Sequence, residues 1–253
     1  MAEIKAVLFD LGETLLSFGT FSKTRLILQG ARSSYDYLKE QEQPVGSFTG
    51  YFLRYLVRLR IRYFLAEFRG KDFDSLALLQ RIGRREGLDL PREQWEEVIW
   101  RWYEPLSVLA ETEPDLPGTL ACLRQSGLKL GIVSNTFVNR ASLDRQLAGL
   151  GLLDFFPMRL YSYELAMRKP DLRLFRIAAE RIGEAPPHIL FVGDRIDMDI
   201  RPALDCGMAA ALKDARTNRG KPTPAAAHRI QLLSELPALI EHINSSATQL
   251  TRA

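Results

Sequence analysis

Short runs of consecutive apolar residues recur along the second half of the chain, and one such run stands alone near its start. The early run covers residues 6–9 and is followed at once by Asp10, two positions before a glycine. Four consecutive apolar residues next to a turn signal are typical of a strand that is buried on both faces. The pattern therefore predicts a buried strand with a carboxylate at its C-terminal end.

From residue 113 onwards, apolar runs alternate with helical patterns. Strands are predicted over residues 128–134, 158–162, 188–192 and 209–212, and helices over residues 117–126, 137–150, 172–182, 200–205 and 236–243. This is the order in which crossover helices connect the strands of a parallel sheet. The second half of the chain therefore predicts an α/β fold with a doubly wound parallel sheet.

Residues 17–110 show only helical patterns. Helices are predicted over residues 22–40, 48–68 and 73–86, and a fourth begins at Pro91, because proline is pre-set for the first helical turn. Four helices without a strand predict a helical module inserted after the first strand. We therefore expect a core of residues 1–16 and 111–244, a helical domain of residues 17–110 and a disordered tail of residues 245–253.

Composition and charge narrow the class of protein only a little. The chain has 46% hydrophobic and 26% charged residues, which is ordinary for a soluble globular protein, and its net charge of +3 gives no reason to expect a nucleic-acid partner. Its two cysteines, Cys122 and Cys206, lack the spacing of a metal site and favour a reducing compartment. Because no signal peptide or run of about 18 apolar residues is visible, we expect a cytoplasmic protein without a membrane partner.

Polar side chains follow the predicted strands at the points where each strand ends. The sets are Asp10 with Thr14, Ser134 with Asn135, Lys169 with Pro170, and Asp194 with Asp199. The carboxyl ends of parallel strands meet at one edge of the sheet, so these groups should converge on one crevice. A buried carboxylate such as Asp10 needs a cation beside it, and Lys169 is the candidate.

The order and spacing of four motifs resemble the haloacid dehalogenase superfamily. The motifs stand here as FDLGETL, IVSNT, RKPD and VGDRIDMD. They correspond to the superfamily's D-x-D-x-T, its Ser or Thr after a strand, its lysine, and G-D-x-x-x-x-D. The resemblance covers residues 4–16 and 113–215 and implies a Rossmann-like core, and the helical insertion resembles a class 1 cap.

The resemblance implies a role for each group at the strand ends. Asp10 would be the nucleophile that forms an aspartyl-phosphate. Mg²⁺, a hard cation that prefers oxygen ligands, would be held by Asp10, Asp194 and the backbone carbonyl of Gly12, with Asp199 as a direct or water-mediated ligand. Lys169 would balance the carboxylates and take part in catalysis. The phosphoryl group would be bound by Ser134, Asn135, Lys169 and Thr14.

One position departs from the superfamily pattern. Gly12 stands where the second aspartate of D-x-D-x-T would protonate the leaving group and activate water. Loss of such general acid/base catalysis typically slows a reaction by about 10² to 10⁴. Either Glu13 or a cap residue replaces it, or the leaving group needs no proton, or the protein is an impaired relative that mainly binds phosphate and metal and serves a regulatory role.

Two other chemistries of the superfamily also lack the second aspartate. Dehalogenases need no metal, whereas the whole G-D-x-x-x-x-D set is present here. Phosphonatases need a cap lysine for a Schiff base, and Lys23, Lys39 and Lys71 are available. The resemblance therefore favours a Mg²⁺-dependent phosphatase of a small phosphorylated metabolite, and it leaves the substrate and the oligomeric state open.

Overall fold

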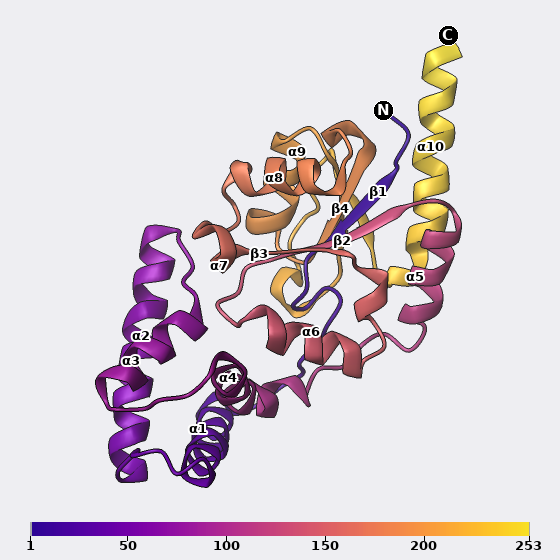
Figure 1. Ribbon diagram of the computed structural model, residues 1–253. Coiled ribbons are helices and arrows are strands. Elements are labelled where there is room, and N and C mark those ends of the chain that lie inside the picture. The colour runs from indigo at the N-terminus through magenta and orange to yellow at the C-terminus, as the bar shows by residue number, and fades with distance from the viewer. Residues whose placement is uncertain (1, 253) are drawn as a thin grey trace.

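A parallel sheet forms the centre of the molecule. The computed structural model describes residues 2–252, with side chains described for residues 2–246. All strand pairs are parallel, in the order β3-β2-β1-β4-β5-β6 (Figure 1). The strands are β1 (Ala6–Phe9), β2 (Lys129–Ser134), β3 (Met158–Tyr161), β4 (Ile189–Gly193), β5 (Ala209–Lys213) and β6 (His228–Ile230). The chain moves outward from β1 in both directions, which confirms the predicted doubly wound α/β fold.

The central strand is buried because helices cover both faces of the sheet. Val7 and Phe9 of β1 belong to one hydrophobic cluster, and Ala6 and Leu8 to another. The first cluster packs against α5 (Leu116–Gln125), α6 (Arg140–Gly149) and α10 (Leu236–Arg252), and the second against α8 (Leu172–Ile182) and α9 (Arg201–Asp205). Alternate residues of β1 thus point to opposite layers, which explains the uninterrupted apolar run.

A second body of four helices lies beside the sheet (Figure 1). Its helices are α1 (Lys23–Glu40), α2 (Phe48–Arg69), α3 (Ser75–Arg85) and α4 (Arg92–Ser107). They share a hydrophobic cluster of their own, which includes Tyr51, Tyr55 and Trp95. The chain enters and leaves this helical module side by side, because Ser17 and Glu111 exchange two backbone hydrogen bonds of 2.8 Å.

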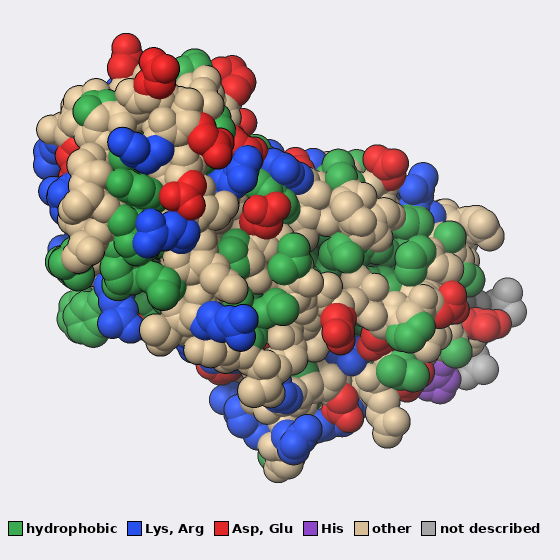
Figure 2. All heavy atoms as spheres, turned by 90° about the horizontal axis from the view of Figure 1, so that it is seen from below, with side chains coloured by type: hydrophobic (Ala, Val, Ile, Leu, Met, Phe, Trp, Pro, Cys, Tyr) green, Lys and Arg blue, Asp and Glu red, His purple; other side chains and the backbone are tan. Residues whose placement is uncertain are grey.

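Helix α2 is apolar on two opposite faces. Tyr51 and Tyr55 are fully buried in the module, whereas large apolar side chains lie exposed on the other side. These exposed side chains are Leu53, Val57, Ile61, Phe64 and Phe68. Figure 2 shows hydrophobic side chains exposed among basic ones on the lobe that the module forms.

Several elements differ from the sequence prediction. Strand β6 was not predicted, because its three residues HRI include one buried apolar side chain. Helix α6 begins at Arg140 rather than near residue 137, because the side chain of Asn139 caps it. Helix α10 continues to Arg252, past the predicted end of the last helix at residue 243, and residue 253 of the predicted disordered tail lies outside the described residues.

The Asn244 side chain accepts a hydrogen bond from the backbone N–H of Ile4 at 2.8 Å, which ties α10 to the segment before β1. No helix among the described residues is both long enough and apolar enough to span a bilayer.

Candidate active site

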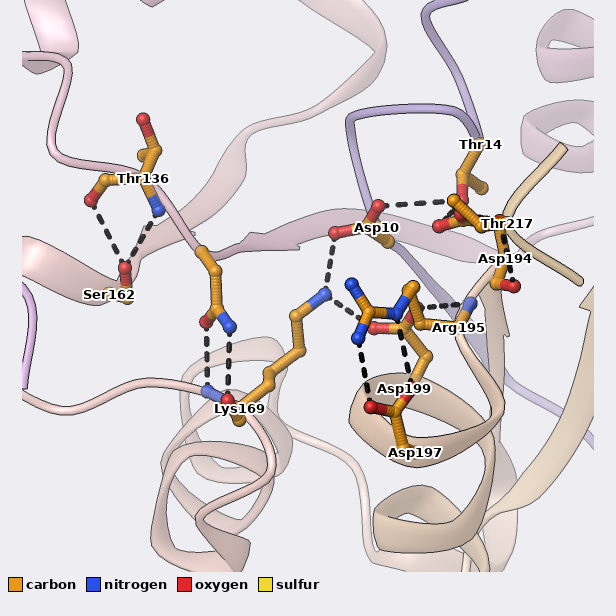
Figure 3. Close-up of polar contacts among 11 residues, drawn as sticks. Asp10, Thr14, Thr136, Ser162, Lys169, Asp194, Arg195, Asp197, Asp199 and Thr217 are labelled. Carbon is orange, nitrogen blue, oxygen red and sulfur yellow. Dashed lines mark hydrogen bonds and ion pairs between the residues drawn. The ribbon is translucent and has the colours of Figure 1, made fainter. Parts of the chain in front are cut away.

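Four buried charged side chains meet at the carboxyl edge of the sheet (Figure 3). Asp10 follows β1 and Asp194 follows β4, and these strands are paired in register up to Phe9 and Val192. Lys169 does not follow a strand directly. It lies in the turn between α7 (Ser162–Leu165) and α8, and it is 2% exposed.

Lys169 joins two of the carboxylates. Its Nζ donates to Asp10 Oδ1 at 2.5 Å and to Asp199 Oδ1 at 2.6 Å (Figure 3). Burial by itself lowers the pKa of Lys169, but the two carboxylates more than offset it and raise that pKa above the ordinary lysine value. Lys169 therefore stays protonated.

Asn135 holds the backbone of Lys169. Its Nδ2 donates to the Lys169 carbonyl at 3.0 Å, and its Oδ1 accepts from the Lys169 N–H at 2.8 Å. This two-way contact uses the Asn135 side chain to position the lysine. The hydroxyl of Ser134, buried at the end of β2, has no hydrogen-bond partner among the described residues. It is thus available to a ligand.

Asp199 is placed by a tight turn after β4. A π-helical turn, Ile196–Ile200, carries it back to the sheet edge, where its Oδ2 accepts from the Arg195 N–H at 2.9 Å. A side chain at Gly193 would come within 2.5 Å of the Asp199 Cβ. The glycine of G-D-x-x-x-x-D therefore lets this carboxylate approach the strand.

Asp194 has hydroxyl donors and no ion pair among the described residues. Thr217 Oγ1 donates to Asp194 Oδ2, and Thr14 Oγ1 lies 3.4 Å from Asp194 Oδ1 and 3.4 Å from Asp10 Oδ2. The side chain of Asn218 donates to the Asp194 carbonyl at 2.8 Å. Neither Thr217 nor Asn218 was predicted from the sequence, because a loop hydroxyl or amide has no characteristic spacing.

The cluster carries more negative than positive charge. One carboxylate oxygen from each of Asp10, Asp194 and Asp199 lies within 4.8 Å of the others, and Lys169 is the one cation in direct contact with them among the described residues. Burial raises the pKa of Asp10 and Asp194 above the usual range, and that of Asp199 to about 6. Three carboxylates and one ammonium leave two negative charges, and hard oxygen donors suit Mg²⁺, so these residues fit a divalent cation.

Gly12 and Glu13 follow Asp10 in the chain and are half-buried. A Cβ added to Gly12 would meet no atom within 4 Å. Glu13 has a positive φ of 58°, and its carboxylate pairs with Arg216 at 3.3 Å. Glu13 and Thr14 line a cavity of about 620 Å³. Glu13 makes no hydrogen bond or ion pair with the four clustered residues in the described part of the chain.

Comparison with known proteins identifies the family. A model of the haloacid dehalogenase-like hydrolases matches residues 4–207, which include all four motifs. The chain belongs to this family. It is a hydrolase, and the helical module is the family's cap inserted into the Rossmann-like core.

Several relatives of this family member are named phosphatases. A glyceraldehyde 3-phosphate phosphatase of Methanopyrus kandleri is 29% identical over 218 residues, covering 86% of this chain and 85% of the relative. An N-acetylmuramic acid 6-phosphate phosphatase of Pseudomonas aeruginosa is 28% identical, covering 82% and 80%. The crystal structure of a phosphatase of the same family from Thermococcus onnurineus superposes with a TM-score of 0.57 at 26% identity, covering 94% of this chain and 98% of the other.

Proposed function

We propose that this hydrolase is a Mg²⁺-dependent phosphatase of a small phosphorylated metabolite and that Asp10 becomes phosphorylated during turnover. The observation that carries the proposal is the buried cluster of three carboxylates and one lysine, whose remaining charge matches a divalent cation. The phosphatase names of the relatives support the reaction class. The same charge balance argues against a metal-free dehalogenase.

Asp10 is the group that would attack phosphorus. Its Oδ1 is held by Lys169, which leaves Oδ2, on the side of Thr14, as the attacking oxygen. In the first step the Asp10 Oδ2–phosphorus bond forms, the phosphorus–ester oxygen bond breaks, and the leaving oxygen takes up a proton from water to become the alcohol. In the second step water attacks phosphorus, the bond to Oδ2 breaks, and the products are inorganic phosphate and the free Asp10 carboxylate.

The other side chains hold and neutralise the phosphoryl group. The free hydroxyl of Ser134 would donate to a phosphoryl oxygen, and Lys169 would keep Asp10 oriented. Bound Mg²⁺, held by Asp10, Asp194, Asp199 and the Gly12 carbonyl, would offset the negative charge of the phosphoryl oxygens. Asn135 takes part through Lys169, whose backbone it fixes.

The proton for the leaving group has no donor at position 12. Glu13 would supply it only by giving up its ion pair with Arg216. For this reason a slow or purely binding relative is the second candidate function. It would bind Mg²⁺ and phosphate without turnover.

Phosphate release from a panel of phosphorylated metabolites and an aryl phosphate, with Mg²⁺ and with a chelator, tests the proposal. We expect Mg²⁺-dependent release that Asp10→Asn abolishes, because an amide is a poor nucleophile. Asp36→Asn, which changes an exposed carboxylate of α1, is the matched control and should keep full activity.

Each other result of this assay would contradict the phosphatase proposal or support a different function. A folded protein that releases no phosphate from any compound would refute the phosphatase function. Binding of Mg²⁺ and phosphate in calorimetry without release would establish the binding protein instead. Halide release from a 2-haloacid in chelator would establish a dehalogenase.

A further inference from the structure

We propose that Thr217 is a positioning residue that fixes the orientation of the Asp194 carboxylate for the divalent cation. This inference rests on the proposed function, since it concerns the cation of that site. It adds a residue that lies outside the four sequence motifs and beyond residue 207, where the family match ends.

The three carboxylates are restrained by different partners. Asp10 and Asp199 each bond to the ammonium of Lys169, and Asp199 also accepts from the Arg195 N–H. Asp194 has neither contact. Its short contact is with the Thr217 hydroxyl, and its other side-chain contact, with Thr14, is long at 3.4 Å.

The position of the Thr217 hydroxyl determines which Asp194 oxygen faces the cluster. Thr217 binds Oδ2, so Oδ1 lies toward Thr14, whose hydroxyl also reaches Asp10 (Figure 3). The terminal torsion of an aspartate is broad, so without a donor on one oxygen this carboxylate would sample other orientations. Hydrogen bonds to metal-binding carboxylates hold them in the binding orientation in this way.

The loop that carries Thr217 is itself fixed. The neighbouring Asn218 is 1% exposed, and its Nδ2 donates to the carbonyls of Asp194 at 2.8 Å and Lys213 at 2.7 Å. Its Oδ1 accepts from Arg229 of β6 at 3.3 Å. Asn218 therefore ties the loop after β5 to the end of β4, and this places the Thr217 hydroxyl against the carboxylate.

The test is calorimetric titration of Mg²⁺ into chelator-treated protein. Thr217→Val keeps the shape and removes the hydroxyl, and we expect its Mg²⁺ dissociation constant to rise about 10- to 100-fold. Thr217→Ser restores the hydroxyl and should bind close to wild type. Thr119→Val, at a buried threonine of α5, is the matched control and should bind like wild type.

A folding defect is separated from the positioning effect by thermal unfolding in chelator, where all variants should melt near the wild type. If Thr217→Val does not fold, Thr217→Ala removes the same hydroxyl with a smaller side chain. In the activity assay the half-saturating Mg²⁺ concentration should rise for the valine variant, while the rate at saturating Mg²⁺ stays close to wild type.

The failures of the two proposals are distinguishable. Equal Mg²⁺ affinity in wild type and Thr217→Val would overturn the role of Thr217 and leave the phosphatase proposal standing. Failure of Thr217→Ser to restore binding would also overturn it, because the hydroxyl would then not be the active group. A wild type that binds no Mg²⁺ would overturn both.

Discussion

Gly12 is the residue at which the family pattern and this chain differ most in chemistry. Its backbone does not require glycine, because its φ is not positive and an added Cβ would meet no atom within 4 Å. The Cβ of an aspartate therefore fits there without displacing a neighbour. The position thus offers a direct test of whether an acid is missing.

We expect Gly12→Asp to raise the turnover of an alkyl phosphate, by up to about 10²- to 10⁴-fold if a full general acid is restored. An alkyl leaving group needs a proton, whereas an aryl leaving group needs little help, so the ratio of the two rates should also rise. Gly12→Ala, which adds the Cβ alone, is the control. Equal rates for the alanine and aspartate variants would show that another group already supplies the proton.

The same pair of substrates examines Glu13, which this structure pairs with Arg216. If Glu13 donates the proton, Glu13→Gln will slow the alkyl phosphate far more than the aryl phosphate. Unchanged kinetics on the alkyl phosphate would remove Glu13 from the mechanism.

At the level of elements, helix α2 carries apolar residues on one face that stabilise the fold and apolar residues on the opposite face that contribute little to its stability. The hydroxyl of fully buried Tyr51 contacts Ser34 Oγ at 2.8 Å and accepts from Trp102 Nε1 at 3.0 Å. On the opposite face, Phe68 is 82% exposed. The two faces should therefore respond very differently to substitution.

We expect Tyr51→Phe to lower the free energy of unfolding by about 1–3 kcal/mol, because it leaves buried polar groups of Ser34 and Trp102 without their partner. Phe68→Ser should change it by no more than about 0.5 kcal/mol, since an exposed side chain loses little on substitution. Urea denaturation of both variants checks this. A large loss for Phe68→Ser would mean that the exposed face is covered in solution.

Strands could be predicted most directly from the sequence where every residue in them is buried. Strands β1 and β4 are buried along their whole length, and their uninterrupted apolar runs mark them. Strand β6 exposes two of its three side chains at least in part, so its pattern carries no such signal. Parallel geometry also predicted that Asp10, Asp194 and Asp199 would meet, whereas the Thr217 contact depends on a loop conformation that no local pattern encodes.

At the scale of the whole molecule, the cap contacts the core close to the catalytic edge. Buried Asp72, between α2 and α3, accepts a hydrogen bond from Ser162 of α7 and lies 3.6 Å from Arg168. The rings of Phe73 and Phe137 stack beside them, with their centroids 5.3 Å apart. The cap is thus attached to the core through the buried carboxylate of Asp72, and one of its partners, Arg168, precedes Lys169 in sequence.

Burial raises the pKa of Asp72 more than Ser162 and Arg168 lower it, so the stability of the fold depends on pH through Asp72. The stabilisation from an acid whose pKa is higher in the folded state is complete when the pH lies below the pKa of the unfolded chain, which is 3.8 for Asp72. It is lost as the pH rises through the pKa of the folded state. We expect the unfolding free energy of wild type relative to Asp72→Asn to fall as the pH rises above 3.8. Urea denaturation at several pH values measures it, and a constant difference would contradict the shift.

The paired backbone of Ser17 and Glu111 has a consequence for how such proteins diversify. Both ends of the cap leave the core at one hydrogen-bonded position, so another cap, or a short turn, would join the core at the same place. The carboxylate cluster belongs entirely to the core. Recombination at this junction would therefore place a new cap over an unchanged carboxylate cluster. The junction is thus a suitable crossover point for chimeras.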